Sequence, residues 1–173
     1  STLVNSLVGR TVSRTGVIRP TTRACVLVHH EQDTRWFTDK RILPELSRVV
    51  GDELDHDPGS VRLVTSEELP PGLALLDAPD IDSVVKANRE LSKQLLSAAD
   101  LWIFVTTAAR YADAVPWEYL RAAADRAAAV AVVLDRVPPA AMGEVPPHLG
   151  GLMTERGLAN SPLFAVPETS VDS

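Results

Sequence analysis

Apolar positions in the second half of the chain form three short runs, separated by stretches with a helical pattern. The runs are GLALLDAP at 72–79, LWIFVTT at 101–107 and AVAVVLD at 129–135. Near-continuous Val, Leu and Ile over five or six residues is typical of strands that are buried on both faces of a sheet. We therefore predict central parallel strands at these three places.

Between the runs, apolar residues recur at the spacing of a helix. Leu91 and Leu95 share one such face, and Trp117, Leu120 and Ala124 share another. PLFAVPE at 162–168 is expected to form a last strand. Strands that alternate with helices in this way predict an α/β fold with a layered, mainly parallel sheet.

The first seventy residues follow a less regular pattern. An opening helix is predicted to end at Gly9, which suits a left-handed C-cap. We expect a loop at 10–23, a strand at 24–30, and an insertion at about 31–70 that has structure of its own, because it is long for a plain connection. Within the insertion we expect a helix at 42–50 and a strand at 60–64. The residues of the first helix expected to face the sheet are Leu3, Val4, Leu7 and Val8, and the residues that share one face of the second are Ile42, Leu46, Val49 and Val50.

Composition narrows the class of protein. A chain of 173 residues with 45% hydrophobic residues predicts a single domain over 1–173 with a substantial core. No run of eighteen apolar residues and no secretory signal pattern occurs, and the single Cys25 fits a cytoplasmic protein. The net charge of -6 argues against nucleic acid as a partner, because phosphate binding requires clustered Lys and Arg. Trp36, Trp102 and Trp117 are interpreted as packing residues and not as a stacking platform.

The chain opens with STLVNSLVG, which has the form of the second half of a phosphate-binding P-loop. The full pattern is G-x-x-x-x-G-K-[ST], which runs into a helix, and this sequence begins at the [ST]. We expect the glycines and the lysine that hold the phosphates to lie upstream of it. Ser1 would then supply the hydroxyl that binds Mg²⁺, although a Ser that only caps the helix explains the same residue.

Two further candidates follow in the order that a Mg²⁺-nucleotide site requires. RPTTR at 19–23 offers Thr21 and Thr22 to the metal and the γ-phosphate, and we favour Thr22 over the alternative of a strand-forming Thr. Asp77 ends an apolar run, where a carboxylate is costly unless it is paired or faces a cleft. Ligands of open α/β sheets bind beyond the carboxyl ends of the strands. We therefore expect Asp77 to hold Mg²⁺ through a water molecule, the alternative being a turn-forming Asp before Pro79.

The ordered set STLVNSLVG, RPTTR, LLDAPDIDS and LWIFVTTAARYAD resembles the P-loop GTPases, in particular the Era-like and dynamin-like group of bacteria, over nearly the whole chain. The resemblance implies a three-layer α/β/α fold whose first strand is missing from the chain, and GTP hydrolysis with Mg²⁺ as cofactor. It implies two switch loops, at 10–23 and from Asp77 to about 86. The implied nucleotide-binding residues are Ser1, Thr2, Thr21, Thr22, Asp77, Asp80, Asp135 and Arg136, with Ser1, Thr22 and Asp77 on the metal.

The resemblance also implies GTP and GDP as ligands and a homodimer across the nucleotide face. Membrane attachment, at the inner face of the membrane, would depend on segments outside this sequence. Arg19 lies three positions before Thr22, the R-x-x-T spacing that places an arginine finger in the α-subunits of heterotrimeric G proteins. Such a residue stabilises transition-state charge, whereas the alternative is a solvated loop arginine.

Three features depart from the family pattern. Asp80 stands where the family has a Gly that donates its backbone N–H to the γ-phosphate, and Ile81 stands where many small GTPases have a water-orienting Gln. The base motif N-K-x-D is replaced by Asp135, Arg136, Val137 and Pro138. Asp135 would accept from the guanine N–H groups only after a backbone shift.

Three functions therefore stay open. The first is a GTP-hydrolysing switch, with Thr22 and Arg19 as the catalytic residues. The second is a degenerate, non-hydrolysing module with a GTPase fold, used for regulation or protein interaction, which Asp80 and the altered base motif favour. A distant third is a flavodoxin-like or receiver-like domain, which Asp77 at the end of a strand would also fit.

Overall fold

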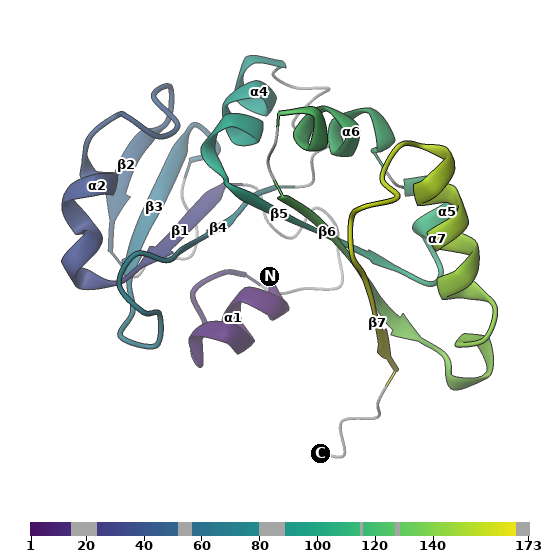
Figure 1. Cartoon of the computed structure of the whole chain (residues 1–173). Helices are drawn as coiled ribbons and strands as arrows, with labels where there is room; N and C mark the ends of the chain where they lie inside the picture. The colour runs from purple at the N-terminus through teal and green to yellow at the C-terminus, as the bar shows by residue number, and fades with distance from the viewer. Residues whose placement is uncertain (15–23, 52–56, 80–88, 115, 127–128, 169–173) are drawn as a thin grey trace. The chain divides into compact units, whose positions relative to one another are not determined.

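The computed structural model describes residues 1–14, 24–51, 57–79, 89–114, 116–126 and 129–168. It has an α/β fold with one mixed and one parallel sheet, and it divides into two compact units, Ser1–Ala98 and Ala99–Ser173. Each unit is described by itself (Figure 1). The expectation of one domain with an insertion remains a prediction.

The first unit is built on a four-stranded sheet of order β2-β3-β1-β4 (Figure 1). Strand β1 is parallel to β3, and β3 is parallel to β2, whereas β1 and β4 are antiparallel. The prediction of a strand at 72–79 is confirmed, but the prediction of a central parallel one is wrong, since the described part of β4 lies at the edge of its sheet. The elements of this unit are α1 (Thr2–Val8), β1 (Cys25–His29), η1 (Glu31–Asp33), α2 (Thr34–Thr38), β2 (Ser47–Val50), β3 (Ser60–Thr65), β4 (Ala74–Asp77) and α4 (Arg89–Ala98).

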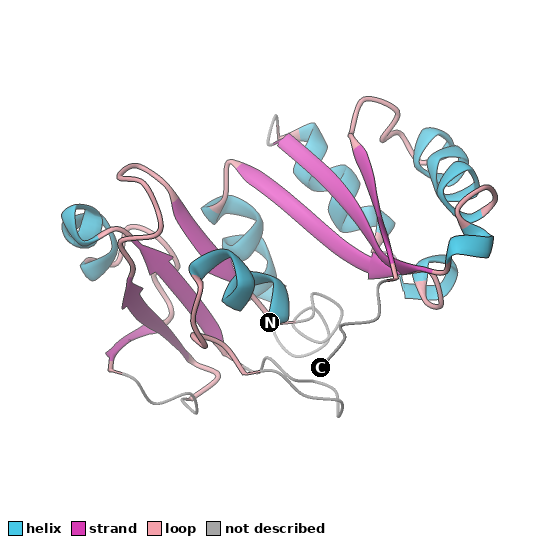
Figure 2. Ribbon diagram, turned by 90° about the horizontal axis from the view of Figure 1, so that it is seen from below, coloured by secondary structure: helices cyan, strands magenta, loops and turns pink. Residues whose placement is uncertain are grey.

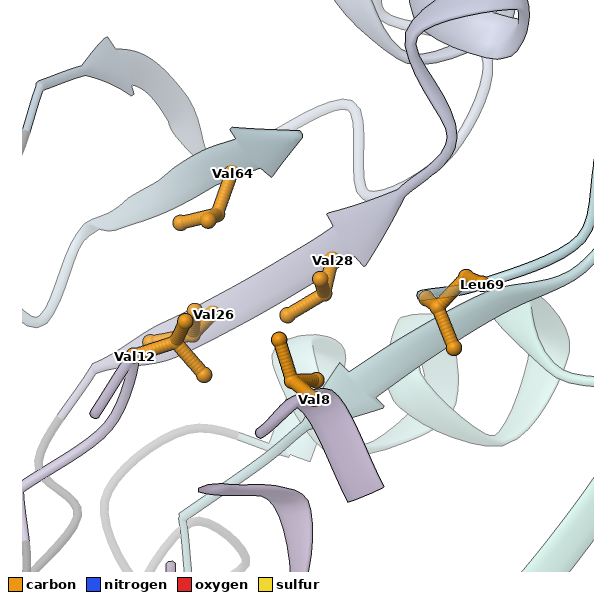
Figure 3. Close-up of a cluster of buried hydrophobic side chains, with 6 residues drawn as sticks. All are labelled: Val8, Val12, Val26, Val28, Val64 and Leu69. Carbon is orange, nitrogen blue, oxygen red and sulfur yellow. The ribbon is translucent and has the colours of Figure 1, made fainter. Parts of the chain in front are cut away.

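Helix α1 ends as predicted at Gly9, whose φ of 69° is left-handed. Val8 is buried against Val26 and Val28 of β1, and Figure 3 shows these side chains together. Leu3 and Leu7 are 43% and 54% exposed, so the prediction that they face this sheet is wrong. Seven residues form only two turns, so the helix covers the sheet with one narrow stripe. The complete buried cluster consists of Val8, Val12, Val26, Val28, Val64 and Leu69.

The insertion contains structure of its own, as predicted, but the helix expected at 42–50 is absent. Residues 47–50 form strand β2 instead, paired with β3. Leu43 has a positive φ of 51°, which is incompatible with a helix at that point. The β-branched pair Val49 and Val50 suits a strand, so tertiary pairing overrode the helical spacing.

Trp36 of α2 is 46% exposed. The guanidinium carbons of Arg35 and Arg41 lie 4.8 Å and 5.7 Å from the centre of its ring. The prediction that Trp36 is a core or partly buried packing residue is therefore wrong. Trp102 and Trp117 are partly buried, as expected.

The second unit has a three-stranded parallel sheet of order β5-β6-β7 (Figure 2). The strands predicted at 101–107, 129–135 and 162–168 are confirmed, and β5 and β6 are parallel as predicted. Only β6 is central, however, because the described part of β5 lies at the edge of this sheet. Leu120 is buried as expected, and Ala123 takes the buried position expected for Ala124. The elements are β5 (Leu101–Thr107), α5 (Tyr111–Ala114), α6 (Trp117–Asp125), β6 (Ala129–Val137), η2 (Pro139–Ala141), α7 (Val145–Glu155) and β7 (Leu163–Pro167).

Both connecting helices of this unit cover the same face of the sheet, as right-handed crossovers between consecutive parallel strands require. Val130, Val132 and Leu134 of β6 alternate along the strand and are buried, as are Leu120 of α6 and Leu149 of α7. Among the described residues, no helix has the length and apolar character needed to cross a membrane.

Candidate functional site

Two residues predicted to bind Mg²⁺ meet at the end of β4. The Ser1 nitrogen lies 3.2 Å from Oδ2 of Asp77, although the two residues are 76 positions apart. Asp77 is the last residue of β4, and Ser1 is the N-cap of α1. The structure thus brings the start of the first helix to the carboxyl end of the strand that carries the predicted carboxylate.

The hydroxyl of Ser1 accepts a hydrogen bond from the Val4 amide at 3.3 Å. This bond makes Ser1 a true N-cap, which is the simpler of the two roles expected for it. A hydroxyl oxygen has two lone pairs, so the cap leaves one of them for another ligand. Thr2, the next residue, is exposed at the first position of α1.

A short strap, defined as residues 12–14, runs past the same place. Ser13 Oγ accepts from the Ser1 nitrogen at 2.5 Å, and the Arg14 carbonyl accepts from it at 2.9 Å. Together with Asp77 Oδ2, these two oxygens lie around the main-chain nitrogen of Ser1 at the start of α1. Ser13 is 2% exposed, so its hydroxyl belongs to the interior of the site.

The Asp77 carboxylate is mostly buried, with its side chain 11% exposed. Val26 is its register partner on the antiparallel strand β1. Burial, with a smaller contribution from the negative charge of Asp77, raises the pKa of the neighbouring Cys25 thiol to about 12.

The donor set suits a hard cation. Serine hydroxyls, a backbone carbonyl and a carboxylate are all oxygen ligands, and Mg²⁺ prefers oxygen and uses few protein ligands when phosphates supply the rest. In the part of the chain that the structure describes, no group of three or more His, Cys, Asp or Glu is placed to hold a metal. The residues present therefore fit Mg²⁺ shared with a phosphate better than a metal bound by protein alone.

The predicted base-recognition residues lie in the second unit, at the carboxyl end of β6. Asp135 pairs in register with Thr107 of β5, and its carboxylate lies 3.7 Å from Nε of Arg136. Arg136 has a positive φ of 52°, and the register between β6 and β7 shifts between Leu134 and Val137. Such an irregularity re-aims side chains near the end of a strand.

A second pair at this carboxyl end was not predicted. The hydroxyl of Tyr111 lies 2.6 Å from Nδ1 of His148, and the rings meet edge to face with centres 5.7 Å apart. Tyr111 belongs to α5 and His148 to α7. No sequence spacing connects them, because 37 positions separate the two residues.

Several predicted residues lie outside the described residues. Arg19, Thr21 and Thr22 of the first switch loop and Asp80 of the second are among them. The structure therefore brings together Ser1 and Asp77, and it adds Asn5 and Ser13. Asn5 stood in the opening motif without a role, and Ser13 carried no signal in the sequence.

In comparisons with known proteins, no family model matches the chain, and neither a curated protein nor a solved structure matches it.

Proposed function

We propose that the chain is the nucleotide-binding part of a GTP-hydrolysing switch protein with a P-loop GTPase form of the α/β fold. The observation that carries this proposal is the placement of Ser1, the N-cap of α1, beside Asp77, the last residue of β4. Apart from the contact from the first switch loop, the protein contacts that a Mg²⁺ ion bound to a nucleotide needs are a hydroxyl at the start of a helix and a carboxylate at the end of a strand.

In this function, Ser1 Oγ would bind the metal directly while it keeps its cap to Val4. Asp77 would accept a hydrogen bond from a water ligand of the metal. The ion, when bound, would neutralise charge on the β- and γ-phosphate oxygens. Upstream glycines and a lysine would hold the phosphates, and Thr22 and Arg19 would complete the site from the first switch loop.

Guanine is the base that we propose, with Asp135 as its acceptor. The irregular backbone at Arg136 supports this assignment, because it interrupts the regular pairing of β6 with β7 between Leu134 and Val137. The ion pair between Asp135 and Arg136 would have to open when the base binds. The side chains of Asp135 and Arg136 are 42% and 62% exposed, so water can replace each partner and the loss of the ion pair costs little free energy.

The test is equilibrium binding and turnover of GTP and ATP by the full-length natural protein, with and without Mg²⁺. We expect GTP to bind more tightly than ATP and to be hydrolysed only with Mg²⁺. Asp77→Asn removes the charge and keeps the shape, and it should reduce turnover at least about tenfold, the effect of losing about 1.4 kcal/mol of transition-state stabilisation. Asp125→Asn is the matched control, because Asp125 is an exposed residue of α6.

A second candidate function is a non-hydrolysing module that keeps the fold for regulation or protein interaction. The observation that favours it is the ion pair between Asp135 and Arg136, in which the carboxylate proposed to accept from the base is already bound to a neighbouring side chain. In addition, Pro138 stands where the family has an Asp. Binding of GTP without turnover would support this second function. Binding of neither nucleotide at millimolar concentration, with or without Mg²⁺, would contradict the proposed GTPase.

A further inference from the structure

The side chain of Trp36 on helix α2 is exposed and lies beside two arginines. Its exposed fraction is 46%. The guanidinium carbons of Arg35 and Arg41 lie 4.8 Å and 5.7 Å from the centre of its ring, within the distance of a cation–π contact. Tryptophan and arginine are enriched among the residues that contribute most to binding at protein interfaces. This group of side chains therefore has the composition of a protein-binding surface.

A shallow groove begins at Arg41 and lies between the segment 41–44 and helix α4 of the same unit. Its volume is about 280 Å³. Residues 42–44 supply apolar side chains, and α4 supplies mostly polar ones. The two sides are joined by a hydrogen bond from the Glu45 amide to Oε1 of Gln94 at 3.4 Å. The volume lies just below the range of about 300–1,000 Å³ for small-molecule pockets, so the groove suits the insertion of a partner's side chain.

The segment between Trp36 and the groove is held in place by hydrogen bonds to its main chain. Arg48 of β2 donates from its guanidinium to the carbonyls of residues 37, 39, 42, 43 and 46. The carboxylate of Asp39 accepts from the Arg41 amide at 3.0 Å. A surface that is already ordered loses less conformational entropy when a partner binds. The exposed side chains of this segment are therefore presented on a fixed backbone.

The charge of this surface indicates the chemistry of its partner. The whole chain has a net charge of -6. The exposed cations of residues 35–45 and of the described side chains of α4 are Arg35, Lys40, Arg41 and Lys93. The carboxylates of the same two stretches are Asp39, Glu45 and Glu90. Cations are thus in excess on this part of an acidic chain, and the two arginines beside Trp36 favour an acidic partner.

Two of the cations already have acidic neighbours. Asp39 Oδ2 lies 2.6 Å from Nε of Arg41, and Glu90 Oε2 lies 3.6 Å from Nζ of Lys93. Between 41% and 73% of each of these side chains is exposed. Exposed ion pairs typically contribute about 1 kcal/mol or less, so a carboxylate of a partner can compete with them.

We propose that the Trp36 surface, defined as Trp36, Arg35, Arg41 and the groove beside α4, binds an acidic peptide segment of a partner protein. A carboxylate of the segment binds the guanidinium of Arg35 or Arg41, and an apolar side chain next to it enters the groove. A membrane of anionic lipids needs exposed cations but no hollow for a single side chain, so a peptide fits this surface better. The inference does not depend on the proposed GTPase function.

The test begins with a phage-displayed library of short random peptides, selected on the full-length natural protein. We expect the selected peptides to carry Asp or Glu next to an apolar residue. Their Kd, measured by fluorescence anisotropy, should rise about tenfold or more in Trp36→Ser and in Arg41→Ala, as for dominant positions of an interface. Arg121→Ala is the matched control, because the side chains of Arg121 and Arg41 are both 68% exposed and each lies beside an aspartate. The control should leave the Kd unchanged.

A second pair of variants tests the groove. Ser97 lines it on the α4 side, and its Oγ donates to the Lys93 carbonyl at 2.8 Å. Ser97→Trp fills the groove and should raise the Kd about tenfold, whereas Ser97→Ala keeps the groove open and should bind like the natural protein. Thermal unfolding of all variants separates a loss of binding from a loss of folding. Equal Kd values for Ser97→Trp and the natural protein would show that no side chain enters the groove and would overturn the proposal.

Three further results would contradict an acidic peptide as the partner. The first is a selection that yields no acidic peptides, or peptides that bind Trp36→Ser as tightly as the natural protein. The second is binding to phosphatidylserine vesicles that Trp36→Ser abolishes, which would identify a lipid surface. The third is self-association that the same variant abolishes, measured by sedimentation velocity, which would identify a second copy of the chain as the occupant.

Discussion

Cys25 is the side chain whose ionisation the fold changes most clearly among the described residues. It is buried at the start of β1, and burial, with a smaller effect of the Asp77 charge, raises its pKa from 9.0 to about 12. A raised pKa means that the folded protein holds the thiol proton more tightly than the unfolded chain. This stabilisation is complete below pH 9 and is lost as the pH rises toward 12.

We expect the free energy of unfolding of the first unit to fall by about 1.4 kcal/mol between pH 8 and pH 10 because of this thiol. The reason is that pH 10 lies one unit above the pKa of the thiol in the unfolded chain, and one pKa unit corresponds to about 1.4 kcal/mol. Thermal unfolding of the natural protein and of Cys25→Ala at both pH values measures the effect. The variant should lose this part of the pH dependence. Equal pH dependence in both proteins would show that the thiol ionises freely in the folded state.

At the same scale, the chemistry of single residues was predictable only where it follows from sequence position. Asp77 at the end of an apolar run and Ser1 before a helical run were both identified, and the structure brings them together. Asn5 and Ser13 were not assigned roles, because their contact depends on a loop folding back onto a helix. Asn5 Oδ1 accepts hydrogen bonds from the amides of Val12 and Ser13, and Asn5 Nδ2 donates to the Ser13 carbonyl. Contacts of this kind leave no periodicity in the sequence.

Among the elements, the segment between α2 and β2 depends on one arginine. Arg48 donates from its guanidinium to the carbonyls of Phe37, Asp39, Ile42, Leu43 and Leu46, with the four longer bonds between 2.8 Å and 3.1 Å. Burial in this cage of carbonyls lowers its pKa, which the charge of Asp39 partly offsets. The helix predicted at 42–50 does not form, because the carbonyls of this segment accept hydrogen bonds from a side chain of β2 and not from the amides of a helix.

Replacing Arg48 with Lys should therefore open this segment. The ammonium has three donors in a compact group and cannot reach carbonyls arranged around a planar fork. We expect a loss of about 2 kcal/mol or more, from buried acceptors left without donors, and faster amide hydrogen exchange at 37–48. Arg121→Lys on the exposed side of α6 is the control and should change stability by less than about 0.5 kcal/mol. Unchanged exchange at 37–48 in Arg48→Lys would contradict the role of the cage.

Taken as a whole, the pattern of the chain predicted the α/β class and most strands, since short runs rich in Val, Leu and Ile that alternate with helical patterns favour strands. Strand direction in the first unit was not predictable, because the antiparallel pairing of β1 and β4 depends on the path of the insertion between them. The apolar run at 101–107 predicted a strand buried on both faces. In the structure, its residues 101, 103 and 105 are between 43% and 53% exposed.

These exposed residues belong to one apolar face of the sheet in the second unit. Val105, Val133 and Phe164 are register partners on β5, β6 and β7, so they point to the same side. The other side is covered by α6 and α7. Parallel sheets are normally covered on both faces, so this open face is the largest departure of the described chain from ordinary α/β packing. Its exposed members are Leu101, Ile103, Val105, Phe164 and Val166.

If the open face is accessible in solution, it should bind the apolar dye ANS, and the double variant Ile103→Thr/Phe164→Thr should bind less dye. Thr keeps strand propensity, so we expect little loss of stability. Val132→Thr is the matched control on the covered side, because Val132 is 0% exposed. It should cost about 1–3 kcal/mol, the usual penalty of burying a hydroxyl, with no fall in dye binding. If the double variant instead loses stability as Val132→Thr does and dye binding is absent throughout, then both faces of this sheet are covered in solution, as the apolar run at 101–107 first predicted.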